Sequence, residues 1–379
     1  MAMTPGRELA ETIVRRIRGQ AGALGAADVA REAGLDRRAL EALLIEHYHA
    51  GAELLLRRAR VRAGTGSDAD FLAVAAMPRA AFRRLGASRS FTLSLPAPYH
   101  RAVALRWLGR DAESRTEGVR GTSMVKALLF DGAPALLRID LGAASARCTL
   151  DRPVSPTAMR KAHVAAVRML GLGVDPAPFE RRAGRDPLLR RLVKGRRGLR
   201  VPLTSSIFEA LLWTVAGQQV NLAFAYRLRR VVIELTGAPA GDGFLAHPSP
   251  AAVARLDYDD LTRRQWSRRK AEYAIDVARS IAGGALDAES LPDAPATAVR
   301  ETLEALRGLG VWSANYVMMR GCGFADCVPL GDSGLASALE HFFSLGHRPD
   351  RAGTDDLMRP FAPYRSLATF HFWAGGFDD

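Results

Sequence analysis

The sequence predicts an α+β protein in which a small antiparallel-sheet domain lies between an N-terminal helical segment and an all-α C-terminal domain. Residues 7–86 and the chain from Pro202 onward show helical apolar patterns, whereas the segment between them alternates apolar and polar residues. The 379 residues suffice for two or three domains, and 48% apolar with 25% charged residues is typical of globular protein. We therefore expect domains at 1–88, 89–200 and 201–379.

The N-terminal segment contains a helix-turn-helix pattern over residues 27–48. Gly34 would make the turn, and Asp36 would cap the second helix. Arg37 and Arg38 would then lie at the exposed start of that helix, where a recognition helix meets the major groove of DNA. The alternative is an ordinary helical hairpin with a solvated arginine pair.

The middle segment reads as four strands followed by a helix. An Asp-Gly pair at 131–132 predicts a tight hairpin turn between two of these strands. The expected strands are 91–99, 123–130, 134–141 and 146–152, and the expected helix is 158–172.

The C-terminal segment is predicted to be helical throughout, with Gly or Pro between the helices. The expected helices are 205–219, 221–236, 250–256, 258–265, 267–283, 296–306, 312–321, 333–343 and 354–374.

Charge and composition favour a nucleic-acid partner and exclude several other classes. The net charge is +13, made up of +5 over 1–90, +12 over 91–200 and −4 over 201–379. Three cysteines are too few for a four-cysteine zinc site or iron–sulfur cluster. No apolar stretch has the length of a membrane span or a signal peptide, so we expect a cytoplasmic, nucleoid-associated protein.

The most specific motif lies in LEALRGLGVWSANYVMMRGCGFADCVPLGDSGL at 303–335. Gly308 and Gly310 flank one apolar residue between two helices, which predicts a tight hairpin with exposed backbone N–H groups. Such a hairpin at a helix start binds a phosphate without needing lysine. A loop containing Gly and Pro follows the second helix and ends at Asp332.

This segment resembles the helix-hairpin-helix DNA glycosylase superfamily and, more closely, its AlkA branch of 3-methyladenine DNA glycosylases. The resemblance extends to residues 205–228, 266–278 and 363–373, and covers about residues 91–379. It implies a glycosylase fold for the helical domain and an AlkA-like N-terminal domain for the stranded segment. Residues 1–88 resemble, more loosely, the AraC-type helix-turn-helix of Ada–AlkA fusions, with 80–87 as the end of a shortened second motif.

By position, Asp332 matches the catalytic aspartate of the superfamily, which would stabilise positive charge on the sugar and orient the attacking water. An ordinary helix N-cap is the other interpretation of this residue. Trp312, Tyr316 and Trp373 match aromatic positions of the base pocket, where electron-rich rings would attract a cationic alkylated base. Aromatic residues at helical spacing are otherwise usually part of a core.

Other positions match DNA contacts of the superfamily. Gln219 matches the wedge that fills the gap left by a flipped nucleotide, although AlkA has leucine there. Gly308, Gly310 and Ser313 match hairpin positions that contact the DNA backbone. The carbonyl groups of Leu306 and Leu309 would be the ligands of a monovalent cation; no cofactor is otherwise required.

The resemblance implies a monofunctional glycosylase for alkylated bases such as 3-methyladenine and 7-methylguanine, acting as a monomer on double-stranded DNA and not at a membrane. Trp312 stands where lyases of the superfamily have lysine, and no lysine follows Lys270, so a Schiff base is not expected. Two alternatives remain open: a non-catalytic DNA-binding regulator, and a glycosylase for deaminated or oxidised purines.

Overall fold

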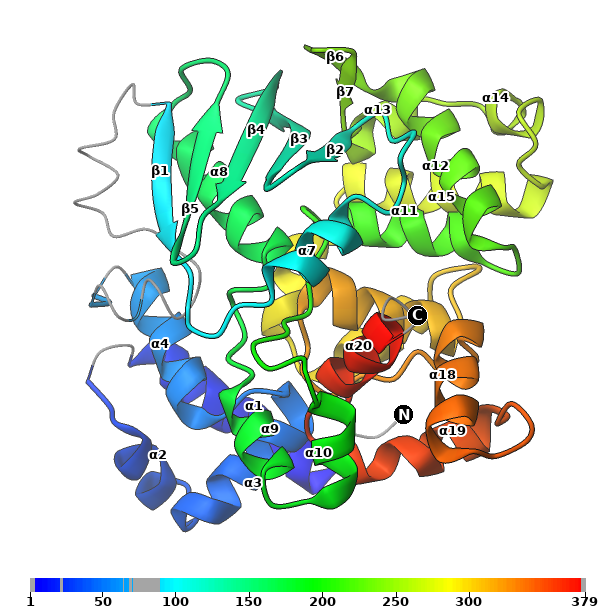
Figure 1. The fold of residues 1–379 in the computed structure, drawn as a ribbon. Coiled ribbons are helices and arrows are strands. Elements are labelled where there is room, and N and C mark those ends of the chain that lie inside the picture. The colour runs from blue at the N-terminus through cyan, green and yellow to red at the C-terminus, as the bar shows by residue number, and fades with distance from the viewer. Residues whose placement is uncertain (1–3, 21–22, 64, 68–69, 71–88, 376–379) are drawn as a thin grey trace.

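The N-terminal helices, the sheet and the C-terminal helices form three adjoining blocks (Figure 1). The structure, a computed structural model, describes residues 4–20, 23–63, 65–67, 70 and 89–375. The predicted end of a second helix-turn-helix at 80–87 lies outside the described residues.

The described part of the first block, which we call the N-terminal helical module, contains four helices. They are α1 (Pro5–Gly19), α2 (Ala26–Glu32), α3 (Arg37–Tyr48) and α4 (Ala52–Ala63). Gly34 makes the turn before α3 with φ +68°, and Asp36 caps that helix by accepting from the Ala39 amide at 2.7 Å. The module buries its own apolar core, which includes Leu40 and Leu44. The predicted pattern at 27–48 thus folds as two helices and a turn.

The N-terminal helical module is docked onto the C-terminal helices. Arg7 pairs with Glu301 at 3.0 Å. At the end of α3, His49 accepts a hydrogen bond from the Asp326 amide at 3.4 Å, and its ring meets Phe324 edge-on. The loop at 324–326 leads towards Asp332 along the chain, so the module packs against the segment that carries the aspartate.

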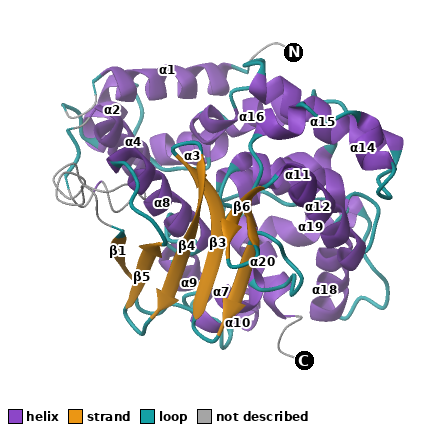
Figure 2. Ribbon diagram, turned by 90° about the horizontal axis from the view of Figure 1, so that it is seen from above, coloured by secondary structure: helices purple, strands orange, loops and turns teal. Residues whose placement is uncertain are grey.

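The middle block is a five-stranded antiparallel sheet in the order β1-β5-β4-β3-β2. Its strands are β1 (Ser90–Ser94), β2 (Glu117–Arg120), β3 (Ser123–Phe130), β4 (Ala133–Leu141) and β5 (Ser145–Leu150). Figure 2 shows β1, β5, β4 and β3 side by side. Asp131 and Gly132 join β3 to β4 with φ values of 53° and 75°, as the Asp-Gly pair predicted. Helix α8 (Pro156–Met169) contributes to the same core as the sheet.

Four elements between residues 89 and 200 are absent from the sequence-based assignment. They are α7 (Arg101–Leu108), β2, α9 (Ala177–Ala183) and α10 (Pro187–Val193). Helices α9 and α10 share a core with the C-terminal helices, where Phe179 and Leu192 pack with Leu335 and Phe361. This core therefore crosses the expected boundary at residue 200.

The third block contains most of the expected helices. They are α11 (Ile207–Gly217), α12 (Leu222–Thr236), α13 (Pro250–Ala254), α14 (Tyr258–Thr262), α15 (Arg268–Ala282), α16 (Ala296–Glu304), α17 (Val311–Tyr316), α18 (Ser333–Phe343), α19 (Arg351–Met358) and α20 (Arg365–Gly375). Shorter turns occur at η1 (Ala288–Asp293), the π-helix η2 (Val317–Cys322) and η3 (Arg359–Phe361). Among the described helices, none has the length and apolar character needed to cross a bilayer.

The prediction of an entirely helical C-terminal segment is wrong at two places. A β-hairpin, β6 (Ala238–Gly241) and β7 (Phe244–Ala246), lies between α12 and α13 because its apolar residues pack against the sheet. The expected helix 354–374 is interrupted between α19 and α20, where Pro360 and Pro363 lack the amide hydrogen that a continuous helix requires.

A buried network of four charges joins the sheet to the C-terminal helices. Lys126 on β3 donates to Glu117 on β2 at 2.5 Å and to Glu209 on α11 at 2.6 Å. Arg229 on α12 pairs with the same two carboxylates at 2.6 and 2.9 Å. Burial alone would raise the pKa of Glu209, but the neighbouring Lys126 cation helps to hold that pKa well below its usual value. The network is balanced only while all four charges are present.

We expect Lys126→Met to lower the free energy of unfolding by about 3–5 kcal/mol, because two buried carboxylates would then share one cation. Urea unfolding monitored by circular dichroism measures this loss. The matched control is Arg138→Met, which removes an exposed pair with Asp242 at 2.7 Å and should cost less than about 1 kcal/mol. Equal losses in the two variants would contradict the role assigned to the buried network.

Candidate active site

Asp332 lies at the end of a loop and at the start of a helix. It is the N-cap of α18, and its Oδ1 accepts the Leu335 amide at 2.8 Å. The preceding Gly331 has φ +92°, a backbone conformation that favours glycine. The capping bond fixes the carboxylate at the helix start, while Oδ2 remains available for other partners. The structure thus bears out the N-cap interpretation and leaves a catalytic role open.

Two tryptophans from different helices donate hydrogen bonds to this carboxylate. Trp312 on α17 donates from Nε1 to Oδ2 at 3.2 Å, and Trp373 on α20 donates from Nε1 to Oδ1 at 3.0 Å. Together with the helix cap, three N–H groups hold Asp332 in one orientation. Two residues that the sequence assigned to an aromatic pocket are therefore also direct partners of the candidate catalytic residue.

The three predicted aromatic residues form one continuous wall. The Trp312 and Tyr316 rings lie 5.6 Å apart with an interplanar angle of 36°. Tyr316 and Trp373 follow at 6.1 Å and 39°. Burial raises the pKa of Tyr316, so its hydroxyl stays neutral at neutral pH.

Three more aromatic residues extend this wall, and sequence reasoning missed all of them. Trp107 on α7 stacks on Trp373 at 5.7 Å and 16°. Trp213 packs against Tyr226, with ring centroids 4.9 Å apart, and lines the same cavity as Tyr316. Trp107 comes from the middle block, far from the motif in sequence, so no spacing rule could link it to the site. Trp213 lies on α11, which the resemblance covers, but its place beside the same cavity as Tyr316 depends on how the helices pack.

A cavity of about 100 Å³ lies beside Tyr316 and Trp107, between the sheet and the C-terminal helices. Its lining includes Arg110 and Arg320, and also all four residues of the buried charge network. The aromatic wall around Asp332 thus adjoins a polar, strongly charged interior.

The turn between α11 and α12 presents Gln219 to solvent. Gln219 has φ +54°, which marks a tight turn, and its side chain is exposed. Leu222, at the start of α12, is 42% exposed, which is unusual for a large apolar side chain. This exposed pair fits a surface that meets another molecule.

The turn is fixed to the hairpin by its other glutamine. Gln218 donates from Nε2 to the Gly308 carbonyl at 2.7 Å and to the Ser313 hydroxyl at 3.1 Å. Lys270 on α15 donates to the Ala216 carbonyl at 2.8 Å, at the C-terminal end of α11. Burial lowers the pKa of Lys270 to about 8. No sequence pattern indicated these supporting roles of Gln218 and Lys270.

The hairpin places its two glycines in different environments. Gly308 has φ +89°, and a Cβ atom there would lie 2.2 Å from the Tyr273 ring. Gly310 is exposed at the start of α17, where a Cβ atom would meet nothing within 4 Å. Ser313 is only 2% exposed and its hydroxyl is bound to Gln218, so a predicted DNA contact would rest on its backbone.

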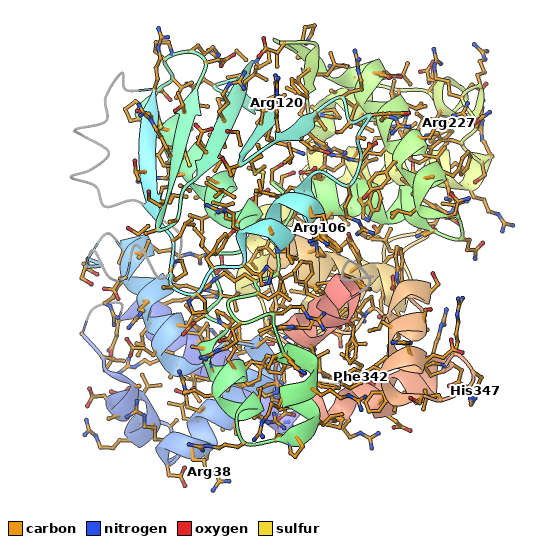
Figure 3. All side chains as sticks on the ribbon, in the orientation of Figure 1. Arg38, Arg106, Arg120, Arg227, Phe342 and His347 are labelled. Atoms are coloured by element: carbon orange, nitrogen blue, oxygen red, sulfur yellow. The ribbon has the colours of Figure 1, made fainter. Side chains whose placement is uncertain are left out.

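The remaining predicted positions stay predictions. The Leu306 carbonyl accepts the Leu309 amide at 3.0 Å, which leaves one lone pair on that oxygen for a cation. Arg37 and Arg38 are exposed at the start of α3. Figure 3 shows Arg38 at the edge of the N-terminal helical module, while Figure 1 places α18 on the opposite side of the view.

Residues 212–363 match the family described as HhH-GPD superfamily base excision DNA repair protein. Over 202 residues, the chain is 35% identical to the DNA-3-methyladenine glycosylase of Bacillus subtilis (strain 168), covering 52% of this chain and 67% of that relative. The chain belongs to the HhH-GPD superfamily. DNA is thus its macromolecular partner. The matched region includes Gln219, the hairpin and Asp332.

Two further comparisons extend the relationship. The putative DNA-3-methyladenine glycosylase YfjP of the same Bacillus strain is 35% identical over 176 residues, or 46% of this chain and 61% of that relative. The 3-methyladenine DNA-glycosylase from Archaeoglobus fulgidus has 19% identity and a TM-score of 0.66, covering 75% of this chain and 97% of the other. The likeness to the Archaeoglobus protein shows the fold. It covers a larger part of this chain than residues 212–363, which match the superfamily.

We expect Gly308→Ala to lower the free energy of unfolding by about 1–3 kcal/mol, because the new methyl group clashes with Tyr273 at a positive φ. Denaturant unfolding measures the change. Gly310→Ala, two residues further along the hairpin, is the matched control. Its free energy of unfolding should stay within about 0.5 kcal/mol of the parent because its Cβ points into open space. Similar losses in both variants would refute the assigned difference.

Proposed function

We propose that this chain is a monofunctional DNA glycosylase that removes alkylated purines, of the 3-methyladenine and 7-methylguanine type, from duplex DNA. It would act as a monomer in the cytoplasm and leave an abasic site for base excision repair. The observation that carries the proposal is the Asp332 carboxylate held between the indoles of Trp312 and Trp373 in a chain of this superfamily.

In this proposal the DNA approaches the face formed by the hairpin and the α11–α12 turn. Backbone amides around Gly308 and Gly310 bind a phosphate, which fixes the register of the duplex. Gln219 enters the space left by the flipped nucleotide and hydrogen-bonds the unpaired base. Gln218 supports this arrangement because it ties the turn to the hairpin by two hydrogen bonds.

Asp332 is the proposed catalytic residue. As the N-glycosidic bond breaks, its electron pair leaves with the base and positive charge develops on the sugar. A carboxylate beside the sugar stabilises that charge, orients a water molecule and accepts one of its protons as the water oxygen forms the new bond to the sugar. The three N–H donors to Asp332 support this role, since they fix its position before the reaction begins.

The aromatic wall is the proposed binding site for the base. A purine alkylated at N3 or N7 is cationic, and the faces of Trp312, Tyr316 and Trp373 attract cations more strongly than neutral bases. Damaged bases also cost less to unpair, which adds to the selectivity.

Hydrolysis without a covalent lysine intermediate fits the residues at this site. Trp312 stands where lyases of the superfamily have lysine, and the Lys270 ammonium donates to the Ala216 carbonyl at the end of α11. A strand-cleaving lyase step therefore has no assigned nucleophile among the described site residues.

We expect Asp332→Asn to reduce base release from methylated duplex DNA at least about 100-fold, because the charge that stabilises the sugar cation is lost. Released bases are separated by chromatography and compared with the parent. Asparagine retains a side-chain oxygen that can cap α18, so the melting temperature and the affinity for DNA should change little. Base release that survives this substitution would refute the catalytic assignment.

The same experiment decides between the enzyme and a non-catalytic DNA-binding regulator. A regulator would bind DNA equally well in both forms and release no base in either. Release by the parent alone supports the enzyme.

We expect Gln219→Ala to slow the release of a base that sits opposite its normal partner, because nothing then fills the gap after flipping. The single-turnover rate of Gln219→Ala should fall about tenfold. Gln219→Leu should keep most of the parent rate because leucine fills the same space. The control is the same lesion opposite a mismatched base, where flipping costs less and the defect should shrink. An equal defect in both duplexes would contradict a wedge.

A further inference from the structure

Arg320 is a buried cation whose hydrogen-bonding capacity is largely unused. It lies on η2, is 5% exposed, and lines the cavity beside Tyr316. Among the described residues, no acceptor lies within hydrogen-bond reach of its Nε and Nη1 atoms. Leaving buried donors unmet is costly, so a residue with two such groups points to a ligand that supplies acceptors.

The neighbouring charges do not meet this need. Lys126, Glu117, Glu209 and Arg229 neutralise one another within the buried network. Arg320 instead packs its guanidinium 4.7 Å from the centre of the Trp107 ring. This stacking holds the planar group in place but leaves its edge, where the N–H groups lie, free to bind an acceptor.

The position of Arg320 relative to Asp332 suggests which part of a base it would meet. Trp312, Tyr316 and Arg320 recur every fourth residue along α17 and η2, so they lie along one side of this helical segment. Trp312 contacts Asp332, and Arg320 is eight residues further along the same helical segment.

A flipped purine that has its sugar at Asp332 and lies along this side of the helical segment would point its far edge towards Arg320. The Watson–Crick edge, which carries the substituent at position 6, is the edge furthest from the glycosidic bond. Enzymes that flip bases read this edge by hydrogen bonds. Arginine offers donors only, so it can bind a carbonyl oxygen at position 6 but not the hydrogens of an amino group there.

We propose that Arg320 is a specificity-determining residue that donates hydrogen bonds to the carbonyl oxygen at position 6 of the flipped purine. It contributes to 6-oxo purines, such as a methylated guanine or deaminated adenine, a hydrogen bond that the amino group of a 6-amino purine cannot accept. This inference rests on the proposed function, because it assumes that the base binds between the aromatic wall and Asp332. Burial lowers the pKa of Arg320, but an arginine remains charged at neutral pH.

The same contact also assists departure of the base. When the glycosidic bond breaks, its electron pair passes to the base, and the carbonyl oxygen shares the added electron density. A cation at that oxygen is then bound more tightly than in the ground state, which accelerates the chemical step. Arg320 forms no bond to the sugar and transfers no proton.

The test uses one duplex treated with a methylating agent, so that 7-methylguanine and 3-methyladenine are present together. Both bases are cationic, and only 7-methylguanine carries a carbonyl oxygen at position 6. Arg320→Met should lower the rate of 7-methylguanine release about 10- to 100-fold, the loss expected for a hydrogen bond to a charged donor. Release of 3-methyladenine should change only a few-fold.

Two further variants sharpen the result. Arg320→Lys keeps a positive charge but loses the planar guanidinium, so it should recover part of the lost 7-methylguanine release. If Arg320→Met does not fold, Arg320→Lys takes its place in the comparison of the two rates. Arg120→Met removes an exposed arginine at the end of β2 (Figure 3) and should leave the ratio of the two rates unchanged.

The outcomes separate this inference from the proposed function. Equal losses for both bases in a folded Arg320→Met protein would overturn the specificity role and indicate a structural one. A parent protein that releases neither base would overturn the proposed function itself. A selective loss of 7-methylguanine release supports both.

Discussion

The buried charge network between the sheet and the C-terminal helices is the constraint on which the site depends. It joins β2 and β3 to α11 and α12 by ion pairs of 2.5–2.9 Å. The sheet block also carries α7, and Trp107 on α7 must stack against Trp373 on α20 to complete the aromatic wall. Ion pairs in a low-dielectric interior are strongly directional when fully hydrogen-bonded, so the network fixes how the two blocks meet. The network thus sets how the two blocks that line the pocket meet.

A second feature of the site is the division of chemistry between its two ends. At one end, three N–H groups converge on Asp332 and leave a negative charge beside the place proposed for the sugar. At the other end, Arg320 and Arg110 lie against Trp107 at 4.7 and 4.3 Å. Both cations already interact with that ring, so the rings near Asp332 are the ones left to attract a cationic base. The site is therefore negative at the sugar end and positive at the far end.

The surface proposed to meet DNA is supported from behind by one helix. Helix α15 supplies Lys270 to the end of α11 and Tyr273 to the underside of Gly308. Gln218 then links the turn to the hairpin. Gln219, the proposed wedge, and the hairpin proposed to bind a phosphate are thus held at a fixed separation, as the proposed contact with a single displaced nucleotide requires. A domain with a net charge of −4 over residues 201–379 suits the proposed contact, in which backbone amides rather than lysines would face the phosphate.

By itself, the sequence determined the local features of this protein: the helices and strands with clear periodicity, the Asp-Gly turn, the hairpin glycines, and Asp332 as the cap of α18. These depend on contacts between residues close in the chain, which spacing reveals. Through a family resemblance, the sequence also pointed to Trp312, Tyr316 and Trp373 as candidate residues of a base pocket. Only the tertiary structure decided that Trp312 and Trp373 bind Asp332, that Trp107 completes the wall, that Arg320 lines the adjoining cavity, and that β6 and β7 pair beside the sheet. Those outcomes depend on packing between segments far apart in the chain, and no local pattern encodes which faces will meet.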